Sequence, residues 1–251
     1  MTLSVIIITK NEAANIGPCI DSVAFADEII VLDSGSTDDT CRIAAERGAK
    51  VSVSETWPGF GPQKNRALDL ATGEWILSID ADERVTEALA HEIQREIAAP
   101  RTDAYKIPRL SNFCGRWIRH SGWWPDHVLR LFRRGTARFT HAAVHESLQS
   151  ASASTVATLD NHFLHYPYAD LESFIAKMNR YSTDAAAMMH AKGRKAGLAG
   201  ATGHAVWTFV RLYVVRRGFL DGREGFLLAV MAAMGSFIRY NKLILLNKQN
   251  N

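Results

Sequence analysis

The sequence has little of what marks several classes of protein. Its three cysteines, Cys19, Cys41 and Cys114, show no paired spacing, so neither a disulfide framework nor a zinc site is expected, and a reducing cytosol is the simplest setting. No apolar run reaches the roughly 18 uninterrupted residues of a transmembrane helix. The net charge of +3 is too small to indicate nucleic-acid binding. Met1 leads directly into an apolar, β-branched segment, so no cleaved leader is expected.

Glycine-rich phosphate loops are also missing. Neither Gly-x-Gly-x-x-Gly nor Gly-x-x-x-x-Gly-Lys-[Ser/Thr] follows any predicted strand. A dinucleotide-dependent dehydrogenase or a P-loop NTPase would therefore lack its phosphate cradle. A nucleotide bound by this chain needs another counter-charge for its phosphates, and a metal ion held by acids would supply one.

The order of predicted elements indicates an α/β fold. The 251 residues are 47% hydrophobic and can bury a large core. Strands are predicted over 5–9, 28–32, 50–54 and 75–80, with helices over 13–26, 41–47 and 61–71 between them. Ser36 or Thr37 is predicted as the N-cap of the second helix. Because these strands are apolar throughout rather than alternating, they indicate a mostly parallel sheet with helices on both faces. In such sheets ligands bind beyond the carboxyl ends of the strands.

The strongest site signal is a buried strand, residues 75–80, that ends in a cluster of acids. Asp80, Asp82 and Glu83 place negative charge at the edge of the sheet, which is costly unless a cation or solvent meets it. In an extended chain Asp80 and Asp82 point to opposite faces, so they can serve one ion only if the strand turns at Ala81. Carboxylate oxygens suit Mg²⁺ or Mn²⁺. Alone, such a triplet is weak evidence, because most are solvated loop acids.

Four segments in order resemble glycosyltransferase family 2, which has the GT-A fold. They are residues 4–12, 28–38, 63–67 and 80–83. Three later segments resemble, more loosely, the lipopolysaccharide-core β-1,4-glucosyltransferases, which add a hexose to the inner-core heptose. These are residues 122–134, 144–146 and 218–225.

The resemblance implies an inverting, metal-dependent glycosyltransferase that uses Mg²⁺ or Mn²⁺. It would move a hexose, most simply glucose, from a UDP-sugar to a lipopolysaccharide inner-core saccharide. Another lipid-linked or cell-envelope glycan is the alternative acceptor. A sugar-1-phosphate nucleotidyltransferase is a rival, but its glycine- and arginine-containing loop is absent at residues 9–12. A scaffold with a lapsed site is a second rival, which the intact Asp80 and Asp82 pair disfavours.

The resemblance also implies which side chains bind the donor. The nucleotide-sugar would be bound by Thr9, Asn11, Glu12, Asp33 and Asp80. Apart from the resemblance, Lys64, on a helix after the third strand, is expected to reach the diphosphate, and His145 to contact the diphosphate or the metal. Asp33 would accept a hydrogen bond from uracil or lie beside the ribose. Asp82 would bind metal and diphosphate, while Asp80 contacts ribose or a metal-bound water. Two alternatives stay open, namely Glu12 as a first-turn helix acid and Lys64 as part of a solvated helix face.

A base near the acceptor hydroxyl must take its proton. We expect Glu146 to be this base and Asp126 to be the reserve candidate, although His145 and Glu146 could instead form a pair that pins a loop. His162 and His165 are expected to play structural roles at a strand end.

Three further residues are expected to bind the acceptor. Trp123 and Trp124 would stack on sugar rings, although one of two adjacent side chains on an extended segment can face the core instead. Arg130 would meet a phosphate, with a solvated surface strand as the alternative.

The last third of the chain is predicted to be helical over 170–192, 202–217 and 223–246. We expect a GT-A catalytic domain over 1–168 and a helical region over 169–251. Basic and aromatic residues flank its apolar helix faces, a pattern that suits the headgroup zone of an anionic bilayer. We therefore predict a cytoplasmic protein that is peripheral on the inner face of the cytoplasmic membrane. Packing against the catalytic domain or a second subunit stays open.

Overall fold

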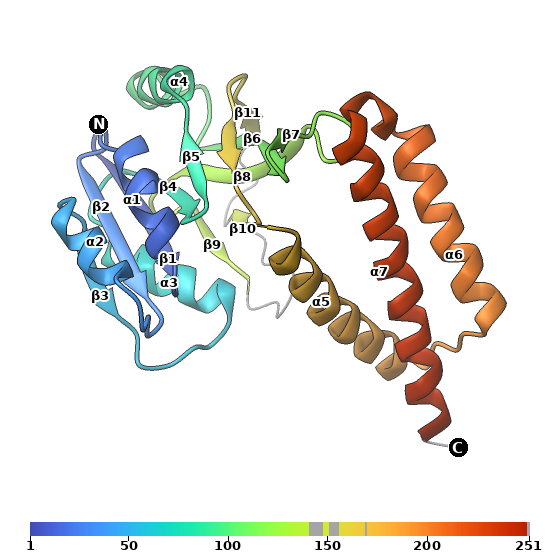
Figure 1. The fold of residues 1–251 in the computed structure, drawn as a ribbon. Coiled ribbons are helices and arrows are strands. Elements are labelled where there is room, and N and C mark those ends of the chain that lie inside the picture. Colours follow the sequence, from blue (N-terminus) through green and yellow to red (C-terminus); the bar gives the residue numbers. More distant parts are fainter. Residues whose placement is uncertain (141–147, 151–155, 169, 250–251) are drawn as a thin grey trace. The chain divides into compact units, whose positions relative to one another are not determined.

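The computed structural model describes residues 1–140, 148–150, 156–168 and 170–249 (Figure 1). The chain forms two compact units. Unit 1 contains Met1–Arg109 and Asp126–His165, and unit 2 contains Leu110–Pro125 and Tyr166–Asn251. Segment 110–125 thus belongs with the C-terminal helices, which the sequence did not indicate. The division into domains 1–168 and 169–251 stays a prediction.

Unit 1 holds the sheet. Its helices are α1 (Ala13–Ser22), α2 (Thr40–Glu46), α3 (Phe60–Leu70) and α4 (Glu87–Ala98). Its strands are β1 (Leu3–Thr9), β2 (Glu28–Asp33), β3 (Lys50–Val53), β4 (Trp75–Asp80), β5 (Glu83–Val85), β6 (Ala104–Phe113, whose end lies in unit 2), β8 (Asp126–Arg133), β9 (Ala137–Phe139), β10 (Leu148–Ser150), β11 (Val156–Thr158) and β12 (Phe163–His165).

The sheet is mixed rather than parallel throughout. The described strands run in the order β3-β2-β1-β4-β8-β6-β12-β5. The first four are parallel, as the sequence predicts, whereas β8 is antiparallel to both β4 and β6. The predicted α/β GT-A fold is confirmed, and its antiparallel part follows the four βα repeats that the sequence pattern marks clearly.

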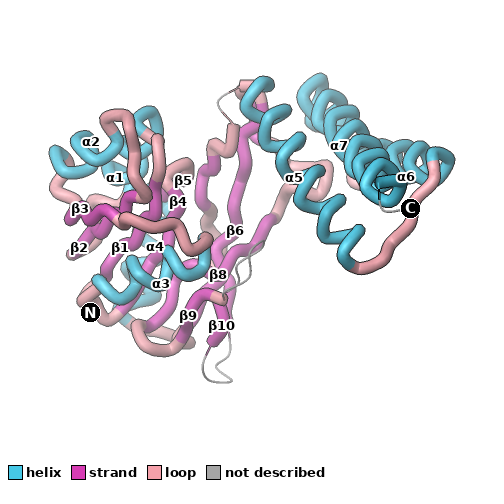
Figure 2. Tube along the Cα trace, turned by 90° about the horizontal axis from the view of Figure 1, so that it is seen from below, coloured by secondary structure: helices cyan, strands magenta, loops and turns pink. Residues whose placement is uncertain are grey.

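Both faces of the sheet are covered at its central strands, which explains why β1, β2 and β4 are apolar at most positions. Val5 and Ile7 of β1 pack with α1, α2 and α4 on one face. Ile6, between them, packs with α3 on the other. Figure 2 shows α3 and the pair α1 and α2 on opposite sides of these strands. Alternate side chains of one strand therefore enter two different cores.

The segment between β2 and α2 differs from expectation in one detail. Ser36 or Thr37 was predicted as the helix cap, but Asp39 occupies the cap position of α2 and makes no side-chain cap bond. Asp38 instead accepts hydrogen bonds from the Thr40 amide (3.0 Å) and from the Ala13 amide (3.1 Å). The carboxylate therefore ties the starts of α1 and α2 together.

Unit 2 is mostly helical. Its elements are β7 (Arg116–Trp117), α5 (Leu171–Ala191), α6 (Leu198–Val210), a π-helical turn η1 (Arg211–Val215), a 3₁₀ turn η2 (Gly218–Asp221) and α7 (Gly222–Gln249). The α5 helix packs on α7 through Phe174, Leu228 and Met231. A Cβ on Gly225 would lie 2.0 Å from the Gly218 carbonyl oxygen, so glycine is required where η2 meets α7.

One helical stretch of the described chain, Gly218–Lys248, is long and apolar enough to cross a membrane, with a mean hydropathy of 1.2 in its most apolar window. The sequence expectation of no such span rested on uninterrupted apolar runs. Length and composition do not separate a membrane span from the core helix of a folded domain, because both pass this test.

Candidate active site

Three predicted site residues lie side by side at the carboxyl edge of the parallel strands. Thr9 ends β1 and is in register with Asp33, the last residue of β2. Asp80 ends β4 and pairs in register with Ile8, one residue before Thr9. Parallel pairing brings these strand ends together, although they are separated by up to 71 positions in the sequence. The edge that the sequence marks as a ligand site is therefore assembled in unit 1.

The acid cluster makes the turn that a shared ion requires. β4 stops at Asp80, Ala81 and Asp82 form a turn, and β5 starts at Glu83. The Glu83 carboxylate accepts a hydrogen bond from the Asp80 amide at 2.9 Å, which closes this turn. A small side chain suits position 81, because Ala81 is buried in the core.

Asp80 lies between two cationic side chains. The Lys64 Nζ atom of α3 is 3.0 Å from Asp80 Oδ1, and the Arg130 guanidinium of β8 donates to Asp80 Oδ2. The Lys64 side chain is only 4% exposed and that of Arg130 only 8%. Lys64 is therefore no part of a solvated helix face, and Arg130 is not a solvated strand arginine.

The pairing continues as an alternating chain of charges. Glu83, which is fully buried, lies 3.4 Å from Arg130 and 3.1 Å from the Arg109 guanidinium. Arg109 in turn contacts Asp126 at 2.6 Å. The sequence places Glu83 in the acid cluster without a role of its own and does not indicate Arg109, because nothing local shows that β8 pairs with β4 and that β6 pairs with β8.

The neighbouring cations control the protonation of Asp80. Burial by itself would raise the pKa of this carboxyl, but the charges of Arg130 and Lys64 outweigh it and hold the pKa well below its ordinary value. Asp80 is therefore an anion at neutral pH and can accept hydrogen bonds from a ligand hydroxyl.

Asp82 faces a histidine that the sequence assigned to structure. His165 Nε2 lies 3.5 Å from Asp82 Oδ2, with side chains 13% and 21% exposed. The strand pairing explains this contact, because β12 runs antiparallel to β5 with His165 opposite Glu83. His165 does end a strand, as expected, but its side chain lies at the acid cluster. Only the pairing of β12 with β5, which is not visible in the sequence, could have revealed this.

The Asp33 carboxylate shapes its own loop. It accepts hydrogen bonds from the amides of Gly35 (2.8 Å) and Ser36 (2.7 Å) and from the Ser36 hydroxyl. Ser36 also accepts the Asn11 amide at 2.8 Å, so it links the two loops rather than capping α2. Asn11 has a positive φ of 55°, which asparagine tolerates, and its Oδ1 accepts the Thr37 amide. The donor-binding roles of Asp33 and Asn11 stay predictions.

Thr9 and Glu12 differ in how their side chains are engaged. The Thr9 hydroxyl is buried and has no hydrogen-bond partner among the described residues. Glu12 stands at the cap position of α1 rather than in its first turn and makes no side-chain cap bond there, and its carboxylate accepts a hydrogen bond from the side-chain amide of Asn15 at 2.8 Å. A buried unpaired hydroxyl beside Asp33 is a place where a ligand atom would relieve an unmet hydrogen bond.

The predicted acceptor and base residues are found in separate parts of the chain. Asp126 begins β8 and receives both bonds from Arg109 on its Oδ2 atom. Glu146 and His145 lie outside the described residues. Trp123 and Trp124 belong to unit 2, where Trp123 packs against Phe113 with ring centroids 6.0 Å apart and Trp124 lies under the Arg119 guanidinium. Their acceptor roles stay predictions.

The donor chemistry of the edge fits a cation that is shared with a substrate. No group of three or more His, Cys, Asp or Glu is placed to hold a metal ion within the described part of the chain. Asp82 and His165, 3.5 Å apart, are the two side chains that would hold such a cation. Mg²⁺ and Mn²⁺ are usually held by one or two carboxylates together with waters and substrate phosphates, so two protein ligands suffice.

The mixed sheet, with acids at the edge of its parallel part and helices on both faces, has the architecture of the GT-A fold. A family model described as glycosyl transferase family 2 matches residues 4–128. An uncharacterized glycosyltransferase of Rickettsia felis is 34% identical over 96% of this chain and 89% of its own length. The chain belongs to glycosyltransferase family 2 and is a glycosyltransferase enzyme.

Two further relatives add detail. A lipopolysaccharide core biosynthesis glycosyltransferase, LpsC, of Rhizobium meliloti is 30% identical over 97% of this chain and 92% of that protein. Among solved structures, S. aureus TarS 1-349 in complex with UDP-GlcNAc matches with a TM-score of 0.51 and 18% identity, covering 100% of this chain and 93% of that chain. At this identity the likeness supports the fold alone.

Proposed function

We propose that the enzyme transfers a hexose, most simply glucose, from a UDP-sugar to an inner-core saccharide of lipopolysaccharide, with inversion and with Mg²⁺ or Mn²⁺. The similarity to a lipopolysaccharide core glycosyltransferase along nearly the whole chain supports the acceptor class. The observation that carries the reaction is the pair of Asp82 and His165 beside the clamped Asp80 at the carboxyl edge of the sheet.

Asp82 and His165 would hold the divalent cation. When bound, that cation neutralises charge on the departing diphosphate as a Lewis acid. Asp80, held ionised by its two cations, accepts a hydrogen bond from a ribose hydroxyl or a water. Lys64 and Arg130 keep Asp80 in place and present positive charge where the diphosphate lies.

The acceptor hydroxyl loses its proton to a carboxylate. Glu146 and Asp126 remain the two candidates. Asp126 lies at the start of β8, with its Oδ2 atom held by Arg109 at 2.6 Å. This contact orients the carboxylate and leaves Oδ1 to meet a hydroxyl, the geometry that a general base needs.

An acceptor that is anchored in lipid places the enzyme at a bilayer. We propose that the C-terminal helices contact the inner face of the cytoplasmic membrane. The basic and apolar character of these helices supports this contact.

The test compares Asp82→Asn with Asp21→Asn, the same chemical change at an exposed residue of α1. UDP-sugars with Mn²⁺ should raise the unfolding temperature of the wild type and of Asp21→Asn, because a ligand stabilises the state that binds it. Asp82→Asn should lose this protection and slow transfer about a thousandfold, since Lewis-acid stabilisation contributes several kcal/mol. Normal turnover by Asp82→Asn would reject the metal role.

A panel of nucleotide sugars in the same assay would identify the donor. If GDP- or dTDP-sugars protect the protein and UDP-sugars do not, the proposed donor is wrong even though the cation site stands.

A further inference from the structure

Unit 2 carries an uncompensated positive charge. Residues 192–248 contain ten Lys or Arg and two Asp or Glu, against nineteen and twenty-four in the rest of the chain. One of these two acids, Asp221, is buried and bonded to the amide and the ring of His120 at 2.8 and 2.9 Å. A charge imbalance of this kind within one region indicates an anionic partner.

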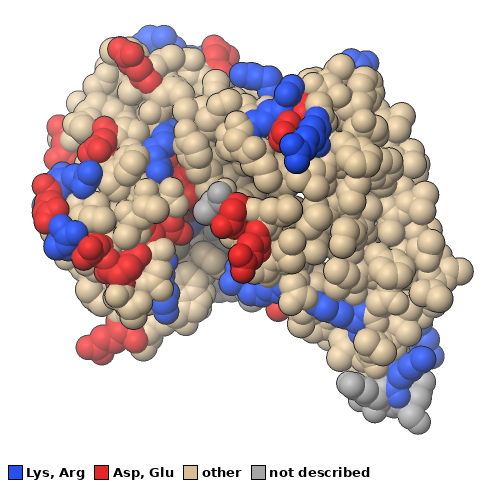
Figure 3. All heavy atoms as spheres, viewed as in Figure 1, with Lys and Arg blue, Asp and Glu red and all other residues tan. Residues whose placement is uncertain are grey.

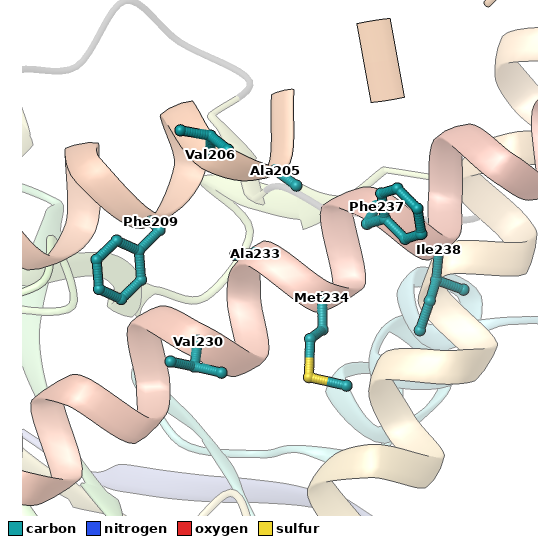
Figure 4. A pocket seen from close by; sticks show the side chains of 8 residues that line it. All are labelled: Ala205, Val206, Phe209, Val230, Ala233, Met234, Phe237 and Ile238. Carbon is teal, nitrogen blue, oxygen red and sulfur yellow. The ribbon is translucent and has the colours of Figure 1, made fainter. Parts of the chain in front are cut away.

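The same helices leave large apolar side chains exposed. Trp207 of α6 is 57% exposed, Val215 of η1 is 59% exposed and Leu245 of α7 is 59% exposed. Figure 3 shows the surface over α6 and α7 as mostly uncharged, with Lys and Arg toward its two ends. Between the two helices lies a groove of about 390 Å³, to which Phe209 and Met234 contribute (Figure 4).

A second pocket of unit 2, of about 320 Å³, has polar and basic side chains on part of its wall and apolar ones on the rest. It lies between α5, the junction of α6 with η1, and α7, and its lining includes Arg211, Arg239, Ser236, Ser182 and Thr208. No Asp or Glu lines it among the described residues. Lys242 adds a third cation nearby, because its Nζ atom donates to the Ser182 hydroxyl at 2.9 Å.

Two polar atoms of this pocket have no partner in the described part of the chain. They are the Ser236 hydroxyl and the Arg239 Nε–H, both buried. A serine within a helix usually bonds the carbonyl four residues before it, and Ser236 does not. Neither Arg211 nor Arg239 makes an ion pair with a described acid. The unpaired Ser236 hydroxyl and Arg239 Nε–H, together with the Arg211 guanidinium, favour a ligand with several anionic oxygens.

We propose that this pocket binds the phosphate group of an anionic phospholipid, while the exposed apolar side chains of α6 and η1 enter the acyl region. Arg211, Arg239 and Ser236 supply the donors that a phosphate needs. The inference rests on the proposed membrane contact and not on the transfer reaction. A second copy of the chain fits this surface less well, because a two-fold interface would oppose the same basic side chains.

The experiment measures binding of the full-length protein, without nucleotide, to sedimented vesicles. Vesicles of phosphatidylcholine alone are compared with vesicles containing about one-third phosphatidylglycerol. Arg239→Lys keeps the charge but loses the planar donor fork, and Ser236→Ala removes one hydroxyl. Each should weaken binding to the anionic vesicles about tenfold, as expected for a lost charge-assisted hydrogen bond. Arg223→Lys, the same change at an exposed position outside the pocket, should bind as the wild type does.

Circular dichroism and the unfolding temperature check that each variant is folded, and hydrolysis of the UDP-sugar, which is independent of lipid, should be unchanged. Unaltered vesicle binding by both pocket variants would overturn the proposal in favour of diffuse surface charge. If inorganic phosphate binds in a manner that depends on Arg239 and no vesicles bind, the pocket takes a free phosphate and the proposed lipid ligand is wrong. A concentration-dependent dimer that replaces vesicle binding would show that the surface meets a second copy.

Discussion

The two units of this enzyme differ in how their charged side chains are arranged. In unit 1 the paired ionic groups at the sheet edge alternate in sign, from Lys64 through Asp80, Arg130, Glu83 and Arg109 to Asp126. In unit 2 residues 192–248 carry ten basic and only two acidic side chains beside exposed apolar ones. A site for a small charged ligand needs fixed and mutually balanced groups, whereas a surface for a large anionic partner needs charge left over.

The largest effect should come from breaking the balanced chain at its centre. Glu83→Ala leaves Arg130 and Arg109 without their shared partner in a buried site, so we expect the free energy of unfolding to fall by about 3–5 kcal/mol. Urea denaturation measures it. Glu46→Ala, which removes an exposed ion pair of α2, is the control and should change little. If both variants lost the same free energy of unfolding, the ion pairs of Glu83 would contribute no more to stability than an exposed surface pair.

Lys64 tests whether the balanced charges also serve the donor. Lys64→Gln should weaken binding of UDP with Mn²⁺ by about 2 kcal/mol, because a charge-assisted contact near the diphosphate is lost. Asp80 keeps Arg130, so this variant should be more stable than Glu83→Ala. Calorimetric titration gives the affinity. Lys50→Gln, on β3 and paired with Glu28, should bind as the wild type does, and matching affinities for both variants would assign Lys64 to structure alone.

His165 tests the cation site itself. His165→Gln should weaken binding of Mn²⁺ in the presence of UDP about tenfold, and binding of Mg²⁺ less, because imidazole is a poorer ligand for Mg²⁺. Titration of each metal with the UDP-loaded protein measures this. His162→Gln, three residues earlier and before β12, is the matched control. An unchanged metal preference in His165→Gln would return His165 to the structural role expected from the sequence.

A smaller effect should appear in the pH dependence of unit 1. Burial would raise the pKa of Glu28, but hydrogen bonds from Lys50, Ser4 and Thr72 outweigh it and lower the pKa from 4.5 to about 2. The stabilisation is therefore complete above about pH 4.5 and is lost as the pH falls toward 2. In Glu28→Gln the free energy of unfolding should fall by about 1 kcal/mol less than in the wild type over this pH range, a figure that allows for solvent screening. Urea denaturation midpoints measured at several pH values between 2 and 4.5 check this. An equal fall of the midpoint in both proteins would show that Glu28 is not the source of the pH dependence.

The smallest effect concerns the surface of unit 2. Trp207→Ser removes an aromatic side chain that is 57% exposed, so the unfolding temperature should not change, while partition onto anionic vesicles should fall about threefold. Thr202→Ser, an exposed position earlier on α6, provides a control on the same helix. If Trp207→Ser lowers the unfolding temperature instead, the apolar face is covered within the protein and is not a surface for an anionic partner.

Local sequence patterns predicted much of the fold. The four parallel strands and the three helices between them lie within a few residues of the predicted ranges, because each buried strand is apolar throughout and ends at a polar turn. The break at Gly218–Asp221 and the long helices of the C-terminal region were equally visible. Helix α6 with the η1 turn spans Leu198–Val215, against a predicted 202–217, a shift at the helix ends that local patterns commonly leave open.

The sequence by itself determined the four strands and three helices of the βα repeats and the acid cluster at the end of β4, and its small Ala81 permitted the turn there, since each depends on neighbours within a few positions. Only the tertiary structure placed His165 beside Asp82, buried Lys64 and Arg130 around Asp80, and grouped segment 110–125 with the C-terminal helices. These outcomes depend on strand pairings and helix contacts between residues far apart in the chain. Spacing along the sequence does not identify such partners, because they are selected by the packing energy of many contacts summed over the whole fold.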